Sequence, residues 1–425
     1  MSPIVTSKPL LKFAGKPLIR HQISTASQIG LNQFVVVANK NNLSNLKAAV
    51  YGIRNIEFAI QEKPSGMAGA ILSASELLAD EPFILFSSDD MVESDAFSQL
   101  SSEYKKTNDC FGYVTAFQVR SYFPGGYLTL NPDRETRRTV EKPHRGEEHS
   151  KFINIVLHLF SQPHRLIDYL TRNETDTDDL YERAIDRIIK DGNRIKVIEH
   201  KGIWQPIKYP WHILETMDFF LKSIKQQLSP TAQISDKAVI DGNVFLEDNV
   251  RVMEGAIIRG PTYIGHNTII GNNTLVRNSN IGDHCVVGYN TEIKNSWIGD
   301  RCSFHSNYIG DSVIEEDCTF GAGAVTANLR LDNIPIRKIV GDEEIETGHD
   351  KLGATVGKGC RFGIHVGLLP GVRVGASSFV GAHVCLNKDL PFDTMALPES
   401  KYRILPYQTD TDGHKKRSLF GEWTE

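Results

Sequence analysis

The sequence lacks the features that mark membrane, secreted and nucleic-acid-binding proteins. No apolar run approaches the roughly 18–20 residues that a membrane span requires. The N-terminus lacks the charged-then-apolar pattern of a signal peptide. The net charge of −5 offers no basic field for nucleic acid. The six cysteines form no CxxC pair, which argues against a structural zinc site and a dense disulfide framework. These absences favour a cytoplasmic protein with no nucleic-acid or membrane partner.

The C-terminal half carries an aliphatic or aromatic residue at almost every sixth position. The run begins at Ile234 and stays in phase to Val276, then slips by single residues as far as Phe320 and is regular again up to Leu386. A period of six fits neither an α-helix nor an alternating strand. It fits a β-helix in which three hexapeptides form one coil, with Gly and Asn at the corners. The pattern predicts a parallel β-helix, in the left-handed form that has this bias, over residues 227–390.

The first 226 residues have a different pattern. A chain of 425 residues exceeds the usual size of one domain. Short apolar strands, "FVVVANK" and "PFILFSSDD", alternate with the helical patterns "HQISTASQIG", "AGAILSASELLAD" and "TDDLYERAIDRIIKDG". This alternation predicts a doubly wound, Rossmann-like α/β domain whose ligands lie beyond the strand ends. "WHILETMDFFLKSIKQQL" is expected to be a helix joining the two domains. The polar segment 391–425 is expected to be a tail that packs on a neighbouring subunit or is disordered.

Three short motifs in the first domain each have two interpretations. Asp89, in "SDD" at the end of a predicted strand, either binds Mg²⁺ on a nucleotide or belongs to an acidic turn. In "QEKPSGMAGAI", the helix start either holds a base or phosphate with backbone N–H groups or is an ordinary capped terminus. Lys142 in "VEKP" either binds a sugar phosphate or is half of a common exposed pair.

His305 is the candidate base of the second domain. It follows the inward-facing Phe304 and is therefore expected to point outward. A neutral imidazole there could deprotonate an amine that attacks a thioester. The spacing alone favours an exposed surface histidine.

The order of the motifs resembles that of the sugar-1-phosphate nucleotidylyltransferases. The chain has "KPLLKFAGKPLI", then Q-x-x-P-x-G, the strand-ending aspartate, a glycine, "EKP", an asparagine and "KYPWHIL" before the hexapeptides. Over residues 1 to about 390 it is similar to the bifunctional members, which carry a left-handed β-helix acetyltransferase domain. "HSNYIGDS" followed by "GAGAVTAN" is similar to the acetyltransferase site of those members.

This resemblance implies two reactions. The first domain would join a sugar 1-phosphate to UTP or dTTP with Mg²⁺ and release pyrophosphate. The β-helix would transfer acetyl from acetyl-CoA to an amino-sugar 1-phosphate, with glucosamine 1-phosphate as the expected acceptor. The amine would attack directly, with no acyl-enzyme. By the same analogy, the subunits would form a homotrimer.

The resemblance also implies roles for particular residues. In the first domain, Lys8 would contact phosphates, Gln61 and Gly66 the base, Asp89 the metal, and Gly126, Glu141, Lys142 and Asn154 the nucleotide or sugar phosphate. In the β-helix, His305 would be the general base, Arg277, Lys294 and Tyr308 would hold the sugar phosphate, and Asn328 would line the acetyl-CoA site.

The sequence departs from the family pattern at several positions. The family begins with a strand and a glycine-rich loop ending in Gly-x-x-x-Arg-Met, and this chain begins at what resembles the final Met. The second metal-binding aspartate of the family falls on Pro206, whose side chain has no donor atom. Ser88 and Met67 replace a glycine and a threonine in the first domain, and Thr319 replaces an asparagine in the β-helix.

Two other functions fit parts of the pattern. One is a nucleotidylyltransferase for plain hexose 1-phosphates, with a β-helix that only assembles subunits or binds effectors. The other is a non-catalytic regulatory subunit with two eroded sites, which the Pro206 replacement favours.

Overall fold

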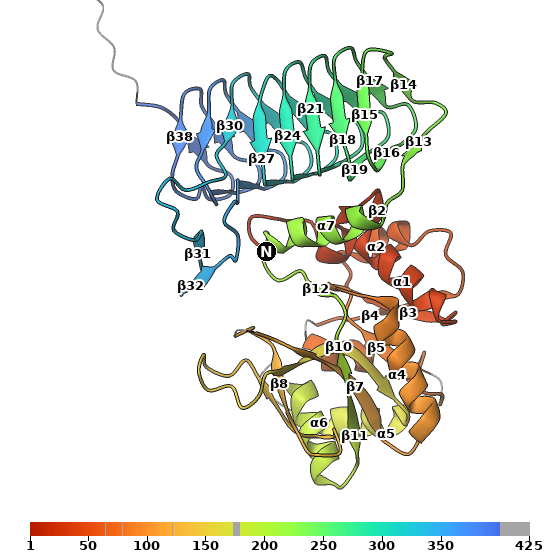
Figure 1. Cartoon of the computed structure of the whole chain (residues 1–425). Coiled ribbons are helices and arrows are strands. Elements are labelled where there is room, and N and C mark those ends of the chain that lie inside the picture. The colour runs from red at the N-terminus through yellow and green to blue at the C-terminus, as the bar shows by residue number, and fades with distance from the viewer. Residues whose placement is uncertain (64, 79, 121, 173–178, 400–425) are drawn as a thin grey trace, which may run out of the picture.

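The computed structural model has two parts: an α/β domain and a long three-sided prism lying across one end of it (Figure 1). It describes residues 1–63, 65–78, 80–120, 122–172 and 179–399. Most of the predicted tail, residues 400–425, lies outside this description. No described helix is long and apolar enough to cross a membrane.

The α/β domain is built from short elements that alternate as the sequence predicts. Its helices are η1 (Lys8–Leu10, a 3₁₀ turn), α1 (Leu18–Gln28), α2 (Leu43–Ala49), α3 (Gly66–Ser73), α4 (Ser94–Thr107), α5 (Pro163–Arg172), α6 (Leu180–Lys190) and α7 (His212–Ser223). Its strands are β1 (Lys12–Phe13), β2 (Lys16–Pro17), β3 (Phe34–Ala38), β4 (Ile56–Ile60), β5 (Phe83–Phe86), β6 (Asp90–Val92), β7 (Gly112–Gln118), β8 (Gly126–Leu130), β9 (Thr136–Glu141), β10 (Phe152–Phe160), β11 (Ile195–His200) and β12 (Trp204–Pro206).

The central sheet of this domain is mixed and covered on both faces. Strand β10 pairs antiparallel with β5, β7 and β8, whereas β11 runs parallel to β7. Strands β3 and β4 form a separate two-stranded parallel sheet. One hydrophobic core packs α1, α2 and α4 on one face, and a second packs α3, α5 and α6 on the other. The domain therefore has the three layers expected of an α/β fold.

Three predicted elements differ from the structure at their ends. The helix predicted over "AGAILSASELLAD" ends at Ser73. The joining helix predicted to run to residue 228 ends at Ser223, because Gln227 and Leu228 form β13 and pair with the first coil of the prism. The strand predicted to end in "SDD" stops at Phe86. Asp90 instead opens β6, because Pro206 and its neighbours in β12 provide a separate pairing partner.

The prism has three parallel faces joined by tight corners. Face 1 contains β13 (Gln227–Leu228), β16 (Val244–Leu246), β19 (Thr262–Ile264), β22 (Asn280–Ile281), β25 (Trp297–Ile298), β28 (Val313–Ile314), β33 (Thr355–Val356) and β36 (Arg373–Val374). Face 2 contains β14 (Gln233–Ile234), β17 (Arg251–Val252), β20 (Ile269–Ile270), β23 (Val286–Val287), β26 (Ser303–Phe304), β29 (Thr319–Phe320), β34 (Arg361–Phe362), β37 (Phe379–Val380) and β39 (Met395–Ala396). Face 3 contains β15 (Val239–Asp241), β18 (Ile257–Arg259), β21 (Leu275–Arg277), β24 (Glu292–Lys294), β27 (Tyr308–Gly310), β30 (Val325–Thr326), β35 (Gly367–Leu368) and β38 (Cys385–Leu386).

The register of the coils explains the period in the sequence. Val252 pairs with Ile270, so one coil takes three hexapeptides. Phe304 pairs with Phe320, sixteen positions later, so coils are shorter where the sequence period slips. This architecture is the left-handed β-helix that the hexapeptides predict. The last strand, β39, extends it beyond residue 390.

The interior of the prism is a continuous stack of the hexapeptide side chains. The rings of Phe304, Phe320 and Phe362 stack at centroid distances of 5.2 and 4.3 Å. Four buried thiols, Cys285, Cys302, Cys318 and Cys360, occupy successive coils, and each donates to a carbonyl oxygen of a neighbouring coil. All six cysteines of the chain are free.

Face 1 is the side of the prism that packs on the α/β domain. Its outward residues Tyr263, Trp297 and Val313 are buried in a core shared with α7 and with the segment that precedes α1. Figure 1 shows α7 and β2 lying directly below the prism. The insertion between β30 and β33 leaves the prism. It contains a hairpin of β31 (Arg337–Val340) and β32 (Glu343–Glu346).

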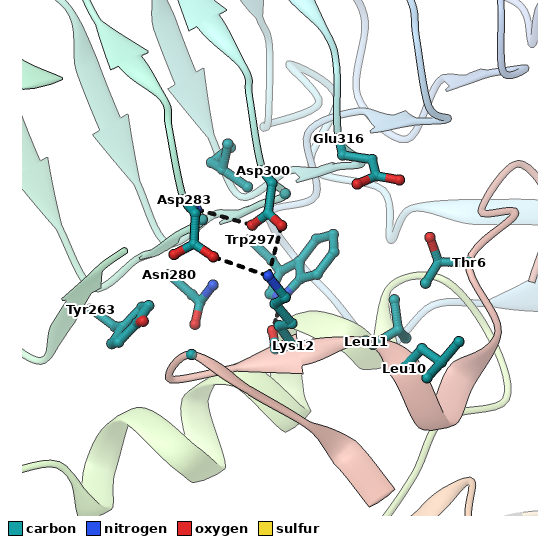
Figure 2. Close-up of a pocket in the computed structure, with 14 residues that line it drawn as sticks. Thr6, Leu10, Leu11, Lys12, Tyr263, Asn280, Asp283, Trp297, Asp300 and Glu316 are labelled. Carbon is teal, nitrogen blue, oxygen red and sulfur yellow. Dashed lines mark hydrogen bonds and ion pairs between the residues drawn. The ribbon is translucent and has the colours of Figure 1, made fainter. Parts of the chain in front are cut away.

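The segment of residues 4–14, which we call the docking segment, is bonded to the prism at several points (Figure 2). The N–H groups of Val5 and Thr6 donate to the Glu315 carboxylate at 2.8–3.1 Å. Lys12 Nζ lies 3.0 Å from Asp283 Oδ2 and 2.7 Å from Asp300 Oδ2. These contacts join groups about 270–310 positions apart in the sequence, so the docking segment belongs to both parts of the molecule.

Candidate active sites

Asp89 lies in a turn that several backbone contacts hold in place. Its N–H donates to Ser87 Oγ at 3.0 Å, and its carbonyl oxygen accepts from Ile207 N–H at 3.2 Å. The buried Gln22 of α1 donates its amide to the carbonyl oxygens of Ser87 and Asp90. The turn is thereby fixed to both α1 and the segment after β12, and the Asp89 side chain remains partly exposed.

Asp90 faces away from Asp89, into the protein. Its Oδ2 accepts from Trp204 Nε1 at 3.0 Å, and the residue pairs across the ladder with Pro206. Burial raises the pKa of Asp90 to about 6, although the Trp204 hydrogen bond opposes that shift. Pro206 therefore lies next to the Asp89 turn. The family pattern has its second metal-binding aspartate at this position, whereas this chain has a proline ring.

Lys8 comes to this turn from the docking segment. Its Nζ lies 2.9 Å from Asp89 Oδ2, and both side chains are partly exposed. The 3₁₀ turn η1, with Pro9 buried at its centre, directs the lysine toward Asp89. The structure therefore brings together the two residues that the sequence assigns to phosphate and metal.

Gln61 and Gly66 lie at the start of α3, as predicted. Gln61 Nε2 donates to the Gly66 carbonyl oxygen at 3.0 Å, which fixes the bend before the helix. A Cβ atom on Gly69 would lie 2.6 Å from Gln61 Nε2 and closer still to Ser65 Oγ, so only glycine fits the inner side of this turn. Pro64 of the same motif lies outside the described residues.

Gly126, Glu141 and Lys142 come together through the β8–β9 pairing. Gly126 is the register partner of Glu141, and a Cβ on Gly126 would lie 3.1 Å from Glu141 Oε2. Lys142 Nζ lies 3.1 Å from Glu141 Oε1. Lys142 also has a φ of +43°, which is strained for a non-glycine residue before proline and is typical of functional sites. An open hollow of about 490 Å³ adjoins it, lined by residues 140–149.

Asn154 is oriented by two buried groups that the sequence interpretation missed. Its Oδ1 lies 2.7 Å from His158 Nε2, and His158 Nδ1 contacts the Tyr181 hydroxyl. Burial lowers the pKa of His158 to about 3, so the imidazole is neutral. A neutral ring can donate from only one nitrogen, so Nε2–H donates to Asn154 and the tyrosine donates to Nδ1. With its oxygen engaged, the NH₂ group of Asn154 is the part of the side chain left to donate to a ligand. A histidine four residues after the asparagine is a weak signal in the sequence alone.

Lys208 is a further residue that the sequence interpretation did not assign. Its Nζ contacts the Pro124 carbonyl oxygen and lies 5.1 Å from the centre of the Phe123 ring. Burial, together with the charges of Lys142 and Lys8, lowers its pKa to about 8. Three lysines therefore share one electrostatic environment in the α/β domain.

The prism holds a second polar cluster at the edge of face 3. Asp311 is buried and accepts from Lys294 Nζ at 3.2 Å and from Asn295 Nδ2 at 2.8 Å. Asn328 donates to Asp311 and, at 3.1 Å, to the Tyr308 hydroxyl. The structure thus joins Lys294, Tyr308 and Asn328, as predicted, and adds Asp311 as their common partner.

Arg277 and His305 lie at the edges of this cluster. Arg277 is the register partner of Lys294 on the adjacent coil, and its guanidinium contacts Glu292. His305 is exposed at the corner between faces 2 and 3, and its ring has no hydrogen-bond partner among the described residues. Its N–H donates to the buried Asn307, which also donates to the carbonyl oxygens of Gly321 and Ala324. Asn307 therefore fixes the corner that presents the imidazole to solvent.

A partly open hollow at the domain junction is not one of these sites. It measures about 90 Å³ and lies where Lys12 meets Asp283 and Asp300 (Figure 2). None of the predicted site residues lines it. Its walls are the contacts of the docking segment, so we assign it to packing between the two parts.

The donor set near Asp89 fits one metal ion held mainly by substrate. Mg²⁺ commonly uses one or two carboxylates together with phosphate oxygens and water. Asp89 supplies one partly exposed carboxylate, whereas Asp90 is turned toward Trp204 and Pro206 supplies no ligand. Within the described residues, no group of three or more His, Cys, Asp or Glu side chains is placed to hold a metal.

Comparisons with known proteins cover both parts of the chain. Residues 4–219 match the "Nucleotidyl transferase" family model, and residues 225–339 match the "GMPPB C-terminal domain" model. The bifunctional protein GlmU of Methanococcus vannielii is 30% identical over 388 residues, which cover 90% of each chain. The bifunctional sugar-1-phosphate nucleotidylyltransferase/acetyltransferase of Sulfurisphaera tokodaii is 30% identical over 402 residues, or 92% of this chain and 95% of that one.

Among solved structures, an apo UDP-glucose pyrophosphorylase is similar with a TM-score of 0.45 and 20% identity, over 52% of this chain and 91% of that chain. The family assignment rests on the model match over half of this chain and on the relatives that extend through both domains. The chain therefore belongs to the nucleotidyl transferase family and, within it, to the group of two-domain proteins named bifunctional GlmU.

Proposed function

We propose that the chain is a bifunctional transferase of amino-sugar nucleotide synthesis. Its α/β domain joins UTP or dTTP to a sugar 1-phosphate, and its prism transfers acetyl from acetyl-CoA to an amino-sugar 1-phosphate. The observation that carries the proposal is the convergence of Lys8, Asp89, Glu141 and Lys142, which come from distant segments of one domain. The names of the two-domain relatives support the same pair of activities.

In the nucleotidyl transfer, a phosphate oxygen of the sugar 1-phosphate attacks the α-phosphorus of the nucleotide. The bond between the α-phosphorus and the bridging oxygen breaks, and pyrophosphate leaves. Lys8 and Lys142 neutralise phosphate charge, and the NH₂ group of Asn154 donates to the sugar phosphate. Gln61 and the α3 start bind the base. Asp89 would hold Mg²⁺ together with phosphate oxygens, and the ion would supply positive charge to the triphosphate.

In the acetyl transfer, the free amine of the sugar attacks the thioester carbonyl carbon. The new C–N bond forms and the C–S bond breaks, while His305 accepts the proton of the attacking nitrogen and returns it to the CoA thiolate. Lys294, Tyr308 and Arg277 hold the phosphate, and Asn328 lines the acetyl-CoA site. The prism cysteines in the core are buried and donate to backbone carbonyls, which favours direct transfer over an acyl-enzyme.

The exposed position of His305 supports assembly into a homotrimer. The cluster of Lys294, Tyr308 and Asn328 lies on face 3, whereas His305 lies at a corner where a neighbouring prism can reach it. Sedimentation velocity tests this proposal, and a monomer at assay concentration contradicts it.

The experiment is a pair of assays on the purified chain. With glucosamine 1-phosphate and acetyl-CoA, we expect release of free CoA. With N-acetylglucosamine 1-phosphate, MgCl₂ and either UTP or dTTP, we expect release of pyrophosphate. If no CoA is released across several amino-sugar phosphates, the acetyltransferase proposal fails, and if no pyrophosphate is released across several sugar phosphates and nucleotides, the nucleotidyl proposal fails.

The match of residues 225–339 to the "GMPPB C-terminal domain" model favours a second candidate. This candidate is a nucleotidylyltransferase for plain hexose 1-phosphates with a prism that does not catalyse. It predicts pyrophosphate release with hexose 1-phosphates and no CoA release with any amino sugar. A regulatory subunit predicts neither.

A further inference from the structure

Lys208 follows β12, the strand that pairs with β6 beside the Asp89 turn. The N–H of Ile207, the residue before it, donates to the Asp89 carbonyl oxygen at 3.2 Å. Lys208 Nζ contacts the Pro124 carbonyl oxygen, and the neighbouring carbonyl oxygen of Gly125 accepts from Lys142 N–H at 3.1 Å. Lys208 therefore lies between the Asp89 turn and the Lys142 segment.

The contacts of the Lys208 ammonium group differ from those of the other two lysines. Its contacts are a backbone carbonyl oxygen, that of Pro124, and the face of the Phe123 ring. In contrast, Lys8 is paired with Asp89, and Lys142 with Glu141. Among the described residues, Lys208 forms no ion pair with a carboxylate, although the side chain is partly buried.

Burial of an ammonium group is unfavourable where no ion pair replaces the lost water. The charges of Lys142 and Lys8 add to this cost for Lys208, and those of Glu141 and Asp90 offset part of it. A bound phosphate would reduce the cost further, because it supplies negative charge near all three lysines. Of these lysines, Lys208 is the one for which no ion pair is found among the described residues, so it is the cation most available to a bound anion.

We propose that Lys208 binds the phosphate of the sugar substrate and holds it beside the nucleotide phosphates. This inference rests on the proposed nucleotidyl transfer and extends it to a residue to which the resemblance assigned no role. Two anions must meet for that reaction, and a fixed cation within range of both Lys8 and Lys142 reduces their repulsion. Because Pro206 offers no metal ligand at this edge, Lys208 supplies positive charge there from the chain itself.

The test is calorimetric binding of N-acetylglucosamine 1-phosphate and of UDP-N-acetylglucosamine to the full chain. Lys208→Met should weaken both affinities by about tenfold or more, which is the usual effect of losing a charge-assisted hydrogen bond. Lys208→Arg keeps the charge and should bind both probes within about threefold of the wild type. The matched control is Lys201→Met, an exposed lysine seven positions earlier, which should change nothing. Thermal unfolding of each variant checks the fold.

Each outcome decides the proposal. Wild-type affinity in Lys208→Met overturns it, and an equal loss in Lys208→Met and Lys208→Arg overturns the role of charge. Binding does not require turnover, so a wild-type chain that binds these probes but releases no pyrophosphate contradicts nucleotidyl transfer and leaves the binding role standing. A wild-type chain that binds neither probe contradicts both.

The pH dependence of binding separates a charge role from a packing role. The pKa of Lys208 is lowered to about 8, so the free wild type loses this charge, and affinity, as pH rises through 8. Lys208→Arg remains charged and should bind almost equally at pH 7 and 9. The other titratable groups facing Lys208 are Lys8, Lys142, Glu141, Asp90 and His212, and they are the same in both proteins. An identical pH profile for the two proteins would contradict the charge role.

Discussion

The two candidate sites are built in different ways. In the prism, Arg277, Lys294, Tyr308 and Asn328 lie on neighbouring coils, and backbone register sets their spacing. In the α/β domain, the functional groups come from segments spread between residues 8 and 208, and each is fixed by a separate contact. A repeated backbone positions side chains without additional supporting residues, but it restricts them to fixed positions along the coils. An irregular domain can place each side chain independently, but each one then needs a supporting residue.

The two candidate sites also differ in the residues that hold their functional side chains in place. Gln22 holds the Asp89 turn, and His158 orients Asn154. In the prism, a single buried carboxylate, Asp311, serves Lys294, Asn295 and Asn328 together. The comparison predicts that a substitution in the Asp311 cluster affects only acetyl transfer or prism stability, and that one at Asn154 or its supporting residues affects only nucleotidyl transfer.

The largest expected effect is that of replacing the proposed base. His305→Asn should lower CoA release by about 10²–10⁴-fold, the usual contribution of a general base, and leave pyrophosphate release unchanged. Coupled assays for the two products measure this. The control is His284→Asn, an exposed histidine at another corner of the prism, which should leave both activities intact. If His305→Asn loses both activities in parallel, the two sites do not act independently.

The second prediction concerns Asp311. Asp311→Asn leaves the largely buried Lys294 without its carboxylate and should lower the free energy of unfolding by about 3 kcal/mol. Urea unfolding followed by circular dichroism measures the change. Asp332→Asn, which removes one member of the exposed Arg330 pair, is the control and should have little effect on stability, because solvent screens both charges. Equal effects of the two variants would show that Asp311 is not the organising group of the cluster.

The third prediction tests the support of Asn154. His158→Leu removes the donor to Asn154 Oδ1 and should reduce pyrophosphate release by about tenfold through loss of orientation, with CoA release unchanged. Steady-state kinetics should show the loss in kcat/KM for the sugar phosphate. His158→Gln keeps a hydrogen-bond donor and should recover part of the lost rate. If His158→Gln is as slow as His158→Leu, His158 does not orient Asn154.

The same histidine gives a pH test of stability. The folded pKa of His158 is about 3 and that of an unfolded histidine about 6.5, so the unfolded state binds more protons below pH 6.5. Stability should therefore fall as pH decreases from 6.5 toward 3. In His158→Gln, the decrease in the free energy of unfolding from pH 7 to pH 5 should be smaller than in the wild type by about 1–2 kcal/mol. An unchanged pH slope would show that His158 is not buried as a neutral ring.

The smallest expected effect lies at the junction. Burial alone would lower the pKa of Lys12, but hydrogen bonds and charges from Asp300 and Asp283 outweigh it and raise the pKa. Because Lys12 is about two-fifths exposed, Lys12→Met should cost less than about 1 kcal/mol, most visibly at low salt. Calorimetric unfolding measures this, with the exposed Lys16→Met as control. A loss that is independent of salt would point to packing and not charge.

The sequence predicted the prism well because its signal is local and repeated. Each inward residue, such as Ile258 or Ile264, is specified by its own hexapeptide and is fully buried. The α/β site was predicted as an order of motifs, and the Lys8–Asp89 and Glu141–Lys142 contacts follow that order.

What the sequence could not predict depends on contacts between distant segments. No local sequence pattern predicts that Asp90 turns toward Trp204. The same holds for the orientation of Asn154 by Tyr181 and His158, and for the contact of Lys208 with the Pro124 loop. The joining helix was overextended for the same reason, since the pairing of Gln227 with Phe245 ends it.

The docking segment has a consequence for how the α/β domain receives its nucleotide. Lys8 lies between two attachment points, Thr6 on Glu315 and Lys12 on Asp283 and Asp300, and both are on the prism. A lysine anchored on either side along the chain has little freedom to lose when a phosphate arrives. The prism thereby pre-organises a group that acts in the other domain, and the boundary between the two activities does not coincide with the boundary between the two folds.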